Sequence, residues 1–505
     1  RVRGALPGSG SPMNAPTVVW QGWPHAPAPL AAIAAARATP GWRLVDEAGA
    51  PLPWGVLRHG RELVRVGWQR TLAMALGTLA GWLAPRRSPP QPVAAAAGDG
   101  PVVLVLPVLP DLSHTFVYRE ALALLRQRPD WRIVVLARND RAPMHDEARR
   151  LLDHVAYLPR DGVTRNALRL LRWLGTARGR SLFALYRAEP GGSVRDLLDR
   201  EALRTPRHPA NAFLLADLLA PLRPRHVHVW SATWPANVAM GAAHLLGVPF
   251  SISSYVDFEF AYALKLLGPK LQRAKFFRVV TRHCRGQLLA MPEAPPDLAN
   301  RAPAIYLGLD LERWQDRAPL AGAGVVVSAA RLVPKKGLHL MPPALALLQT
   351  RGIACRWRVV GDGPELEPLR AQCRRHGVEH IVDFLGPQDN ATVRRELLAA
   401  DAAVLPCVLT PDGERDGIPI FLCEAMALGV PPVTTPVAGI PELVRDGETG
   451  FLARPGDVAT LADALARALG PRATARAVAD RARAEAHARL DVDRLCSALL
   501  AEIER

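Results

Sequence analysis

The most informative run in this chain is Val325-Val326-Val327-Ser328-Ala329-Ala330-Arg331, which continues as Leu332-Val333-Pro334-Lys335-Lys336-Gly337. The short β-branched run predicts a buried strand, and the apolar residues after Gly337 recur with helical spacing. Arg331 and Lys336 would therefore lie at the carboxyl end of a strand, where doubly wound sheets bind their ligands. A guanidinium fork and an ammonium group together suit the oxygens of a diphosphate.

A second run supplies two carboxylates near the start of a helix. It reads Asp416-Gly417-Ile418-Pro419-Ile420-Phe421-Leu422-Cys423-Glu424, with seven residues between the two acids. Pro419 is typical of the first helical position, and the free amides of a first turn attract phosphate. Glu424 could accept hydrogen bonds from ribose hydroxyls, and Asp416 could contact a sugar. Taken alone, the two acids fit a helix cap and a solvated helical residue equally well.

Around these runs, two series of short β-branched segments alternate with longer helical periods. The first series is 102–106, 133–136, 226–229, 250–253 and 278–281. The second is 325–330, 356–360, 382–385, 402–405 and 432–435. Such alternation predicts an α/β protein with two parallel sheets, each covered by helices on both faces. The cleft between two such domains is the natural place for an active site.

We therefore expect four parts along the chain. They are an irregular N-terminal extension with a Pro- and Ala-rich linker (1–100), a Rossmann-like domain (101–312), a second Rossmann-like domain (313–487) and a terminal helix (488–505). The longest apolar run, 71–85, has about fifteen residues, fewer than the ~20 that a spanning helix needs. No secretory leader is recognisable, and Met13 is a candidate start.

Composition narrows the class of protein. The chain has 505 residues, 49% hydrophobic and 22% charged, as expected for a globular protein of two or three domains. The net charge of +16 calls for an acidic partner or surface, unless the Arg-rich composition only reflects a biased genome. Nucleic acid is a poor candidate, because no stacking-aromatic or zinc motif accompanies the charge. Six scattered cysteines indicate reduced thiols of a cytoplasmic protein.

Several motifs together resemble the retaining glycosyltransferase family 4, in particular its exopolysaccharide and colanic-acid-type members. In the carboxyl half they are Arg331…Lys336-Gly337, Val360-Gly361-Asp362-Gly363-Pro364, Asp416-Gly417-Ile418-Pro419…Glu424, Gly439-Ile440-Pro441-Glu442 and Asp446-Gly447-Glu448-Thr449-Gly450-Phe451. In the amino half they are Leu112-Ser113-His114-Thr115-Phe116-Val117, with His114 in place of the family's Glu, and Tyr306-Leu307-Gly308-Leu309-Asp310. The resemblance covers about residues 100–505 and is stronger in the carboxyl half.

The resemblance implies a GT-B fold, in which two Rossmann-like domains face a cleft. It also implies transfer of a sugar, with retention of configuration, from a UDP- or GDP-sugar to a glycan or lipid-linked acceptor, with no metal or other cofactor. By position, Arg331 and Lys336 hold the diphosphate, Glu424 the ribose and Asp416 the donor sugar. Further nucleotide contacts are implied at Gly361, Gly363, Gly417, Ile418, Pro419, Gly439 and Ile440. Ser113, His114, Thr115 and Tyr255 fall on the acceptor or sugar side.

Two positions depart from the family pattern. The family's paired Glu is Asp416, one methylene shorter, and a His expected after the strand near 250 appears as Tyr255. A Tyr hydroxyl can hydrogen-bond a sugar but supplies no titrating imidazole. Either Tyr255 takes over the contact, or the match is displaced along the chain, or activity is reduced.

Arg165, Arg169 and Arg172 recur at helical spacing among leucines. Such a basic amphipathic helix suits an anionic membrane surface, and a peripheral position on the inner face of the membrane, but it also fits an ordinary surface helix. His226 and His228 are expected at strand ends or on the surface.

Two rival functions remain. The first is a catalytically impaired GT-B scaffold that binds nucleotide or partners at the membrane. Tyr255 and Asp416 favour this scaffold, whereas an intact set of Arg331, Lys336 and Glu424 favours transfer. The second rival is a nucleotide-sugar epimerase.

Overall fold

The computed structural model describes residues 99–111, 115–139, 146–159, 163–186, 207–255, 266–411 and 413–505, together with four short strands nearer the N-terminus. The chain divides into two compact units, and each is treated separately below. The larger unit contains two six-stranded sheets. The smaller unit contains the four short strands and the helices between residues 163 and 217.

The first sheet is entirely parallel. Its strands are β5 (Val102–Leu109), β6 (Arg132–Arg138), β7 (Val155–Tyr157), β8 (His226–Trp230), β9 (Phe250–Ser254) and β10 (Phe277–Val279), in the spatial order β10-β9-β8-β5-β6-β7. Almost every residue of β5, β8 and β9 is buried, because a parallel sheet with helices on both faces has no solvent side. Helices that follow these strands include α3 (Thr115–Gln127), α4 (Asp146–Leu151), α9 (Trp234–Leu246), α11 (Leu267–Arg273), α12 (Arg282–Leu289) and α13 (Leu298–Arg301).

The second sheet is also parallel. Its strands are β11 (Val325–Ala329), β12 (Arg356–Val360), β13 (Val382–Gly386), β14 (Ala402–Leu405), β15 (Pro432–Thr434) and β16 (Phe451–Leu452), in the order β13-β12-β11-β14-β15-β16. Numbered along the chain, both sheets have the strand order 3-2-1-4-5-6 of nucleotide-binding doubly wound folds. The expected fold class, two Rossmann-like doubly wound domains, is therefore confirmed, while the domain boundaries stay predictions.

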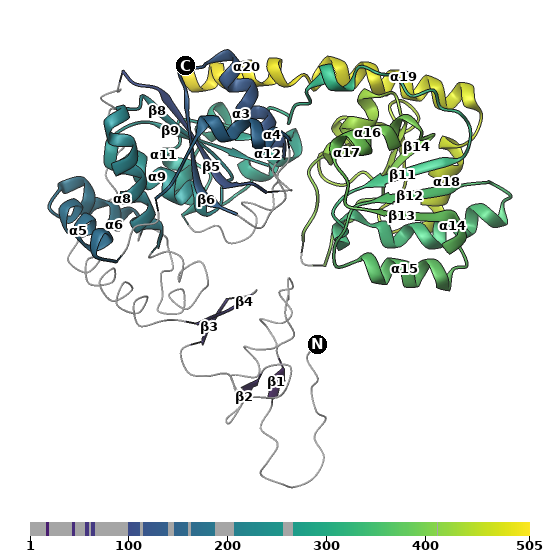
Figure 1. Ribbon diagram of the computed structural model, residues 1–505, viewed down its shortest axis with the longest axis horizontal. Helices are drawn as coiled ribbons and strands as arrows, with labels where there is room; N and C mark the ends of the chain where they lie inside the picture. The colour runs from purple at the N-terminus through teal and green to yellow at the C-terminus, as the bar shows by residue number, and fades with distance from the viewer. Residues whose placement is uncertain are drawn as a thin grey trace, which may run out of the picture. The chain divides into compact units, whose positions relative to one another are not determined.

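Helices cover both faces of the second sheet (Figure 1). They are α14 (Met341–Thr350), α15 (Leu366–Arg375), α16 (Asn390–Leu398), α17 (Ile420–Ala427), α18 (Val458–Ala468) and α19 (Arg472–Arg489). Val326, Val327 and the residues of β14 are fully buried in a core that α14, α17 and α18 share. The sheet thus holds the loops at its carboxyl edge on a rigid base.

The terminal helix α20 (Val492–Glu504) returns to the first sheet. Asp491 is its N-cap, because the Asp491 side chain accepts a hydrogen bond from the Arg494 amide. Its apolar face, which includes Val492, Cys496 and Leu499, belongs to the same buried core as α3, and Figure 1 shows the two helices side by side. The last residues of the chain therefore complete the core of the amino-terminal sheet.

The smaller unit contains α5 (Val163–Leu174), α6 (Ala177–Tyr186) and most of α8 (Arg207–Leu219). Asp217 of α8 accepts hydrogen bonds from Arg169 Nε at 2.7 Å and Trp173 Nε1 at 2.9 Å, and it also pairs with Arg172. The Trp173 ring stacks on Phe213 with centroids 6.0 Å apart. These contacts hold the polar and aromatic face of α5 against α8.

The structure adds elements that the sequence patterns did not indicate. β7 and β16 are three and two residues long, too short to produce a visible period. Before residue 100, where we expected an irregular segment, β1 (Thr17–Val19) pairs with β2 (Arg43–Val45), and β3 (Val56–His59) pairs with β4 (Glu62–Arg65). Two 3-10 turns, Pro334–Lys336 and Leu338–Leu340, precede α14.

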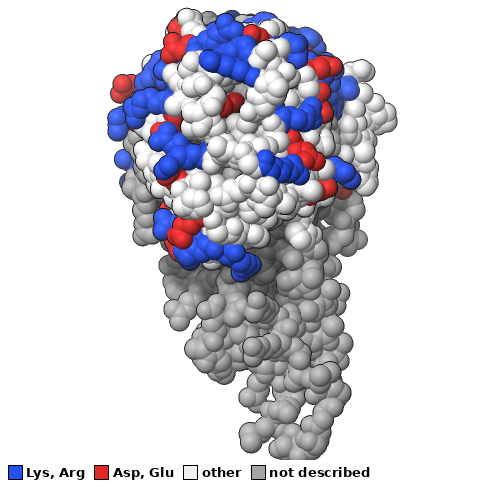
Figure 2. Space-filling view, turned by 90° about the vertical axis from the view of Figure 1, so that its right-hand side faces the viewer, with Lys and Arg blue, Asp and Glu red and all other residues white. Residues whose placement is uncertain are grey.

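Many of the cationic side chains have acidic partners. Figure 2 shows Lys and Arg in separate clusters, with Asp and Glu beside them, on the face turned to the right in Figure 1. Pairs in the carboxyl half include Arg351–Asp463 at 2.7 Å and Arg356–Asp383 at 2.6 Å. On this face the excess positive charge is not gathered into one continuous band.

Candidate active site

The strand order itself marks a ligand site in the second sheet. Chain order reverses between β11 and its neighbour β14, and ligands of doubly wound sheets bind beyond the carboxyl ends of the strands at such a point. Arg331 follows the end of β11, and Cys407 follows the end of β14. The two loops that carry the predicted diphosphate residues and Asp416 therefore start side by side.

Glycines allow these loops to approach one another closely. At Gly337, with φ of 69°, an added Cβ would lie 1.9 Å from the carbonyl oxygen of Pro406, in the loop after β14. At Gly361, with φ of 134°, it would lie 1.9 Å from the carbonyl oxygen of Ala330. At both positions the backbone has a positive φ, which residues other than glycine rarely adopt, and the neighbouring carbonyl oxygen leaves no room for a Cβ atom. The predicted Gly361 and Gly363 thus lie against the loop that carries Arg331.

Lys336 and Asp416 form an ion pair at this edge of the sheet. Lys336 Nζ lies 2.7 Å from Asp416 Oδ2, and the two side chains are 15% and 14% exposed. Lys335 Nζ lies 3.7 Å from Asp416 Oδ1 and 3.2 Å from Glu414 Oε1. The structure thus brings two of the predicted catalytic residues into direct contact and adds Lys335, which we had not singled out although it adjoins Lys336 in the sequence.

The pair keeps both groups charged. Burial raises the pKa of the Asp416 carboxyl, but the positive charges of Lys336 and Lys335 together lower it by more. The pKa of Asp416 therefore lies below its usual value. Burial likewise lowers the pKa of Lys336, but Asp416 raises it above the usual range. Arg331 is exposed, and its positive charge lowers the pKa of both Asp416 and Lys336. The result is a cation-rich edge with one carboxylate at its centre.

The segment after Asp416 packs against a second predicted motif. The Gly439 amide donates to the Gly417 carbonyl oxygen at 3.2 Å, and a Cβ on Gly439 would lie 3.2 Å from a methylene of Ile418. Ile440 is fully buried immediately beyond. Pro419 is the N-cap of α17, so the helix begins one residue later than expected, at Ile420.

Glu424 lies in the middle of α17 and is buried. Its Oε1 is 3.8 Å from Arg119 Nη2 of α3, with side chains 9% and 6% exposed. Burial raises the pKa of the Glu424 carboxyl to about 7, Arg119 opposes the rise, and Glu147 adds to it. Arg119 was not predicted. The signal that could have found it is the charged doublet Arg119-Glu120 inside the apolar run of a buried helix.

The acceptor-side residues are partly described. Ser113 and His114 lie outside the described residues, and Thr115 is the first residue of α3. Tyr255 is 8% exposed, and its ring meets that of Phe116 edge-on with centroids 4.8 Å apart. The Tyr255 carbonyl oxygen lies 3.4 Å from the position of a Cβ on Gly417. Tyr255 is therefore next to the loop that carries Asp416.

His226 and His228 are buried within the first sheet. His226 begins β8, which is one of the two expected positions, but neither residue lies on the surface. Both bond to the hydroxyl of Ser251 on the neighbouring strand at 2.7 Å, and His228 also bonds to Ser253 at 3.0 Å. Burial lowers the pKa of His226 to about 3, and that of His228 well below its usual value. Both imidazoles are therefore neutral members of a hydrogen-bonded core.

Glu442, in the Gly-Ile-Pro-Glu motif, accepts hydrogen bonds from the start of a helix and from a tyrosine, which the sequence did not indicate. Its carboxylate accepts hydrogen bonds from the amides of Arg282 at 3.0 Å and His283 at 2.8 Å, at the start of α12. It also accepts one from the Tyr306 hydroxyl at 2.7 Å. A carboxylate at a helix N-terminus satisfies free amides and interacts favourably with the helix dipole.

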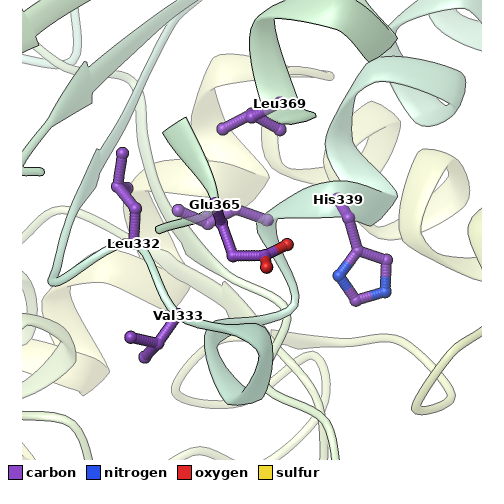
Figure 3. Close-up of a pocket in the computed structure, with 6 residues that line it drawn as sticks. Leu332, Val333, His339, Glu365 and Leu369 are labelled. Carbon is purple, nitrogen blue, oxygen red and sulfur yellow. The ribbon is translucent and has the colours of Figure 1, made fainter. Parts of the chain in front are cut away.

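A small hollow lies beside the loop that carries Arg331 and Lys336 (Figure 3). It is lined by Leu332, Val333, Leu338, His339, Glu365 and Leu369. Burial lowers the pKa of His339, and the nearby Glu365 carboxylate opposes this shift. Its lining therefore combines four apolar side chains with one imidazole and one carboxylate, and Leu332 directly follows Arg331 in the sequence.

Among the described residues, no group of three or more His, Cys, Asp or Glu side chains is arranged to hold a metal ion. All six cysteines are buried and unbridged. Within the described ranges, every helix is too short or too polar to cross a membrane.

In the second half of the chain, residues 312–485 match the family of glycosyl transferases group 1. The protein named as the colanic acid biosynthesis glycosyltransferase WcaL of Salmonella typhimurium is 36% identical over 183 residues, which are 36% of this chain and 44% of that protein. The amylovoran biosynthesis glycosyltransferase AmsK of Erwinia amylovora is 35% identical over 142 residues, 28% of this chain and 35% of that protein. The chain thus matches less than half the length of these relatives.

Structural comparison covers more of the chain. The crystal structure of Anabaena Alr3699/HepE in complex with UDP-glucose superimposes with a TM-score of 0.60 at 17% identity, over 80% of this chain and 99% of that one. At this identity the likeness concerns the fold, which agrees with the GT-B arrangement of two Rossmann-like domains.

Proposed function

We propose that this protein is a retaining, metal-independent glycosyltransferase that moves a sugar from a nucleoside-diphosphate sugar to a glycan acceptor in exopolysaccharide or surface polysaccharide biosynthesis. The observation that carries the proposal is the cationic edge formed by Arg331 and Lys336 at the switch point between β11 and β14. It lies in the domain that matches the glycosyl transferases group 1. The polysaccharide relatives support the pathway class.

Each residue has a defined task in the proposed reaction. The bond from the sugar's anomeric carbon to the diphosphate oxygen breaks, and the acceptor oxygen attacks from the same face. The acceptor's proton passes to the departing diphosphate. Arg331 and Lys336 stabilise the negative charge that develops on that diphosphate, and such preorganised cations are effective because they need no reorganisation during the reaction. The Asp416 carboxylate, held by Lys336, contacts the sugar hydroxyls, and Glu424 binds the ribose.

The test is transfer itself. The protein is incubated with UDP- and GDP-sugars and a lipid-linked glycan, with and without a chelator, and the product's anomeric configuration is read by NMR. We expect transfer with retention that the chelator does not change. An inverted product would contradict the retaining mechanism. An isomerised nucleotide sugar formed without acceptor would favour an epimerase, and nucleotide binding without turnover would favour a scaffold.

We further propose that the acceptor is lipid-linked and that α5 rests on an anionic membrane surface. Leu168 and Leu171, three residues apart on α5, are 63% and 65% exposed. Arg165 is exposed, and the Arg172 side chain is 63% exposed. Residues 163–186, which form α5 and α6, include five Arg and no Asp or Glu. Exposed leucines flanked by arginines suit the boundary between acyl chains and anionic headgroups.

Vesicle sedimentation tests this attachment. We expect binding to vesicles that contain phosphatidylglycerol, weaker binding at high salt, and little binding to phosphatidylcholine alone. Leu168→Ser with Leu171→Ser should abolish the binding. Leu152→Ser is the control. Leu152 is 39% exposed but lies outside α5, so this substitution should leave vesicle binding unchanged. Equal binding by the double variant, or equal binding to neutral vesicles, would contradict the proposal.

A further inference from the structure

The carboxylate assigned to the ribose is paired with a cation from the other sheet. Glu424 Oε1 and Arg119 Nη2 are 3.8 Å apart, and both side chains are less than a tenth exposed. Glu424 comes from α17, beside the second sheet, whereas Arg119 comes from α3, beside the first. Arg119 Nη1 also donates to the carbonyl oxygen of Gly308 at 3.4 Å. The guanidinium therefore connects α3 with the backbone at Gly308 and with the donor-side carboxylate.

A rigid support fixes the helix that carries Arg119. The next residue, Glu120, accepts two hydrogen bonds from Arg278, at 2.8 Å and 2.6 Å, and a third from Trp230 Nε1 at 3.0 Å. Glu120, Arg278 and Trp230 are at most 1% exposed. A bidentate pair of this kind defines geometry as well as energy. The direction of Arg119 is thus set by a buried network one residue away.

The distance of the Arg119 pair has a chemical meaning. At 3.8 Å the contact exceeds hydrogen-bonding distance, so it acts through charge alone. Arg119 can therefore favour the ionised form of Glu424 without occupying its oxygen lone pairs. An ionised carboxylate can accept hydrogen bonds from two adjacent hydroxyls, which a protonated carboxyl does less well.

We propose that Arg119 is a positioning residue for the donor site, which favours the ionised form of Glu424 as the ligand of the ribose hydroxyls. This inference rests on the proposed function, because it takes Glu424 as the ribose ligand. It also assigns a task to α3, the helix that begins at the acceptor-side residue Thr115.

The other groups around Glu424 show in which direction the loss of Arg119 would shift its pKa. Burial raises the pKa of Glu424 to about 7, and the Glu147 carboxylate of α4 adds to the rise. Glu147 is itself paired with Arg313, Nη1 to Oε1 3.2 Å. The adjacent Cys423 is neutral, because burial raises the pKa of its thiol to about 12. His487 of α19 bonds instead to the Ala427 carbonyl oxygen at 3.1 Å, at the carboxyl end of α17.

The experiment measures UDP and GDP affinity by titration calorimetry between pH 6.5 and 8.5. If the pKa of Glu424 rises by one unit, Arg119→Met should weaken the affinity at pH 7 by about fivefold, since half of the wild-type carboxyl is ionised when pKa and pH are equal. At pH 8.5 the ratio of wild-type to variant affinity should fall below about twofold, because both carboxyls are then mostly ionised. The ratio cancels the titration of the nucleotide's own phosphates. Arg119→Lys should retain most of the affinity.

Two further variants separate positioning from folding. Glu147→Gln removes the negative charge that raises the pKa of Glu424, so it should bind nucleotide more tightly than the wild type at pH 6.5 and equally at pH 8.5. This gain would be measurable even if Arg119→Met proved unstable. Arg126→Met, on the same helix but half exposed and paired with Asp493, is the control and should not change the affinity at any pH.

The possible results separate an error in the donor site from an error in the role of Arg119. If the wild type binds neither nucleotide, the donor site is wrong and the role of Arg119 falls with it. If the wild type binds but Arg119→Met binds equally, or is weakened by the same factor at every pH, only the role of Arg119 is wrong. A Glu147→Gln variant with unchanged affinity at pH 6.5 would also overturn that role.

Discussion

Replacing Lys336 by Met should affect stability and activity in ways that a second substitution can separate. In the wild type, Lys336 Nζ lies 2.7 Å from Asp416 Oδ2, with both side chains about one-seventh exposed. Among the described residues, removing the ammonium leaves Asp416 with only the more distant Lys335 Nζ, at 3.7 Å, as a directly paired cation. The orphaned carboxylate should destabilise the fold, and the diphosphate should lose a stabilising charge.

The magnitudes follow from the burial of the pair. Losing one partner of a buried ion pair costs about 3–5 kcal/mol, and the remaining cation should reduce this to roughly 2–4 kcal/mol. Turnover should fall by roughly 10²–10³, the range for losing one charge-stabilising group. Adding Asp416→Asn to Lys336→Met removes the orphaned charge, so most of the stability should return. Turnover should not return, because the cation is still missing.

The assay combines urea unfolding, followed by circular dichroism, with sugar transfer in the same buffer. Lys335→Met is the matched control, since this neighbouring lysine also pairs with Glu414 at 3.2 Å, and a smaller loss of turnover is expected. A change in the free energy of unfolding of less than about 0.5 kcal/mol in Lys336→Met, the size of an ordinary surface substitution, would contradict a stabilising role of the pair. A double variant that regains turnover together with stability would contradict the role of Lys336 in transfer.

Two further predictions concern single residues. Glu424→Gln should raise the melting temperature relative to the wild type at pH 8 but not at pH 4. Burial raises the pKa of this carboxyl to about 7 from its usual value of 4.5, so the wild type loses up to roughly 3 kcal/mol of stability as pH rises between these values. Equal pH profiles for the two proteins would contradict this. Gly337→Ala should lower the melting temperature and weaken UDP or GDP binding, because its Cβ would meet the Pro406 carbonyl oxygen at 1.9 Å. An unchanged melting temperature would show that the loop has room for a side chain.

Much of the fold could be predicted because parallel strands buried on both faces leave a plain signal. The expected segments 356–360 and 402–405 coincide with β12 and β14, residue for residue. The short edge strands β7 and β16 were missed, because two or three residues show no period. Edge strands of this length depend on their neighbour in the sheet, which a local pattern does not contain.

The site was predictable by position but not by partner. The loops after β11 and β14 meet because of the strand order, which the sequence indicates only indirectly. The pairing of Lys336 with Asp416 therefore could not be seen in either motif alone. The pair Arg119–Glu424 joins residues in different halves of the chain, and His226 and His228 depend on serines of the next strand. Each of these contacts is set by tertiary structure.

The most direct test of the central claim is a thermal-shift measurement with UDP, GDP and ADP on the wild type and on Arg331→Met. Arg331 is exposed, so its replacement should leave the unliganded melting temperature unchanged. At a nucleotide concentration of about 100 Kd, binding should add roughly 2.7 kcal/mol of stability. One nucleotide should raise the melting temperature of the wild type, and Arg331→Met should lose this shift. An equal shift in both proteins, or none with any nucleotide, would contradict a diphosphate site at the carboxyl end of β11.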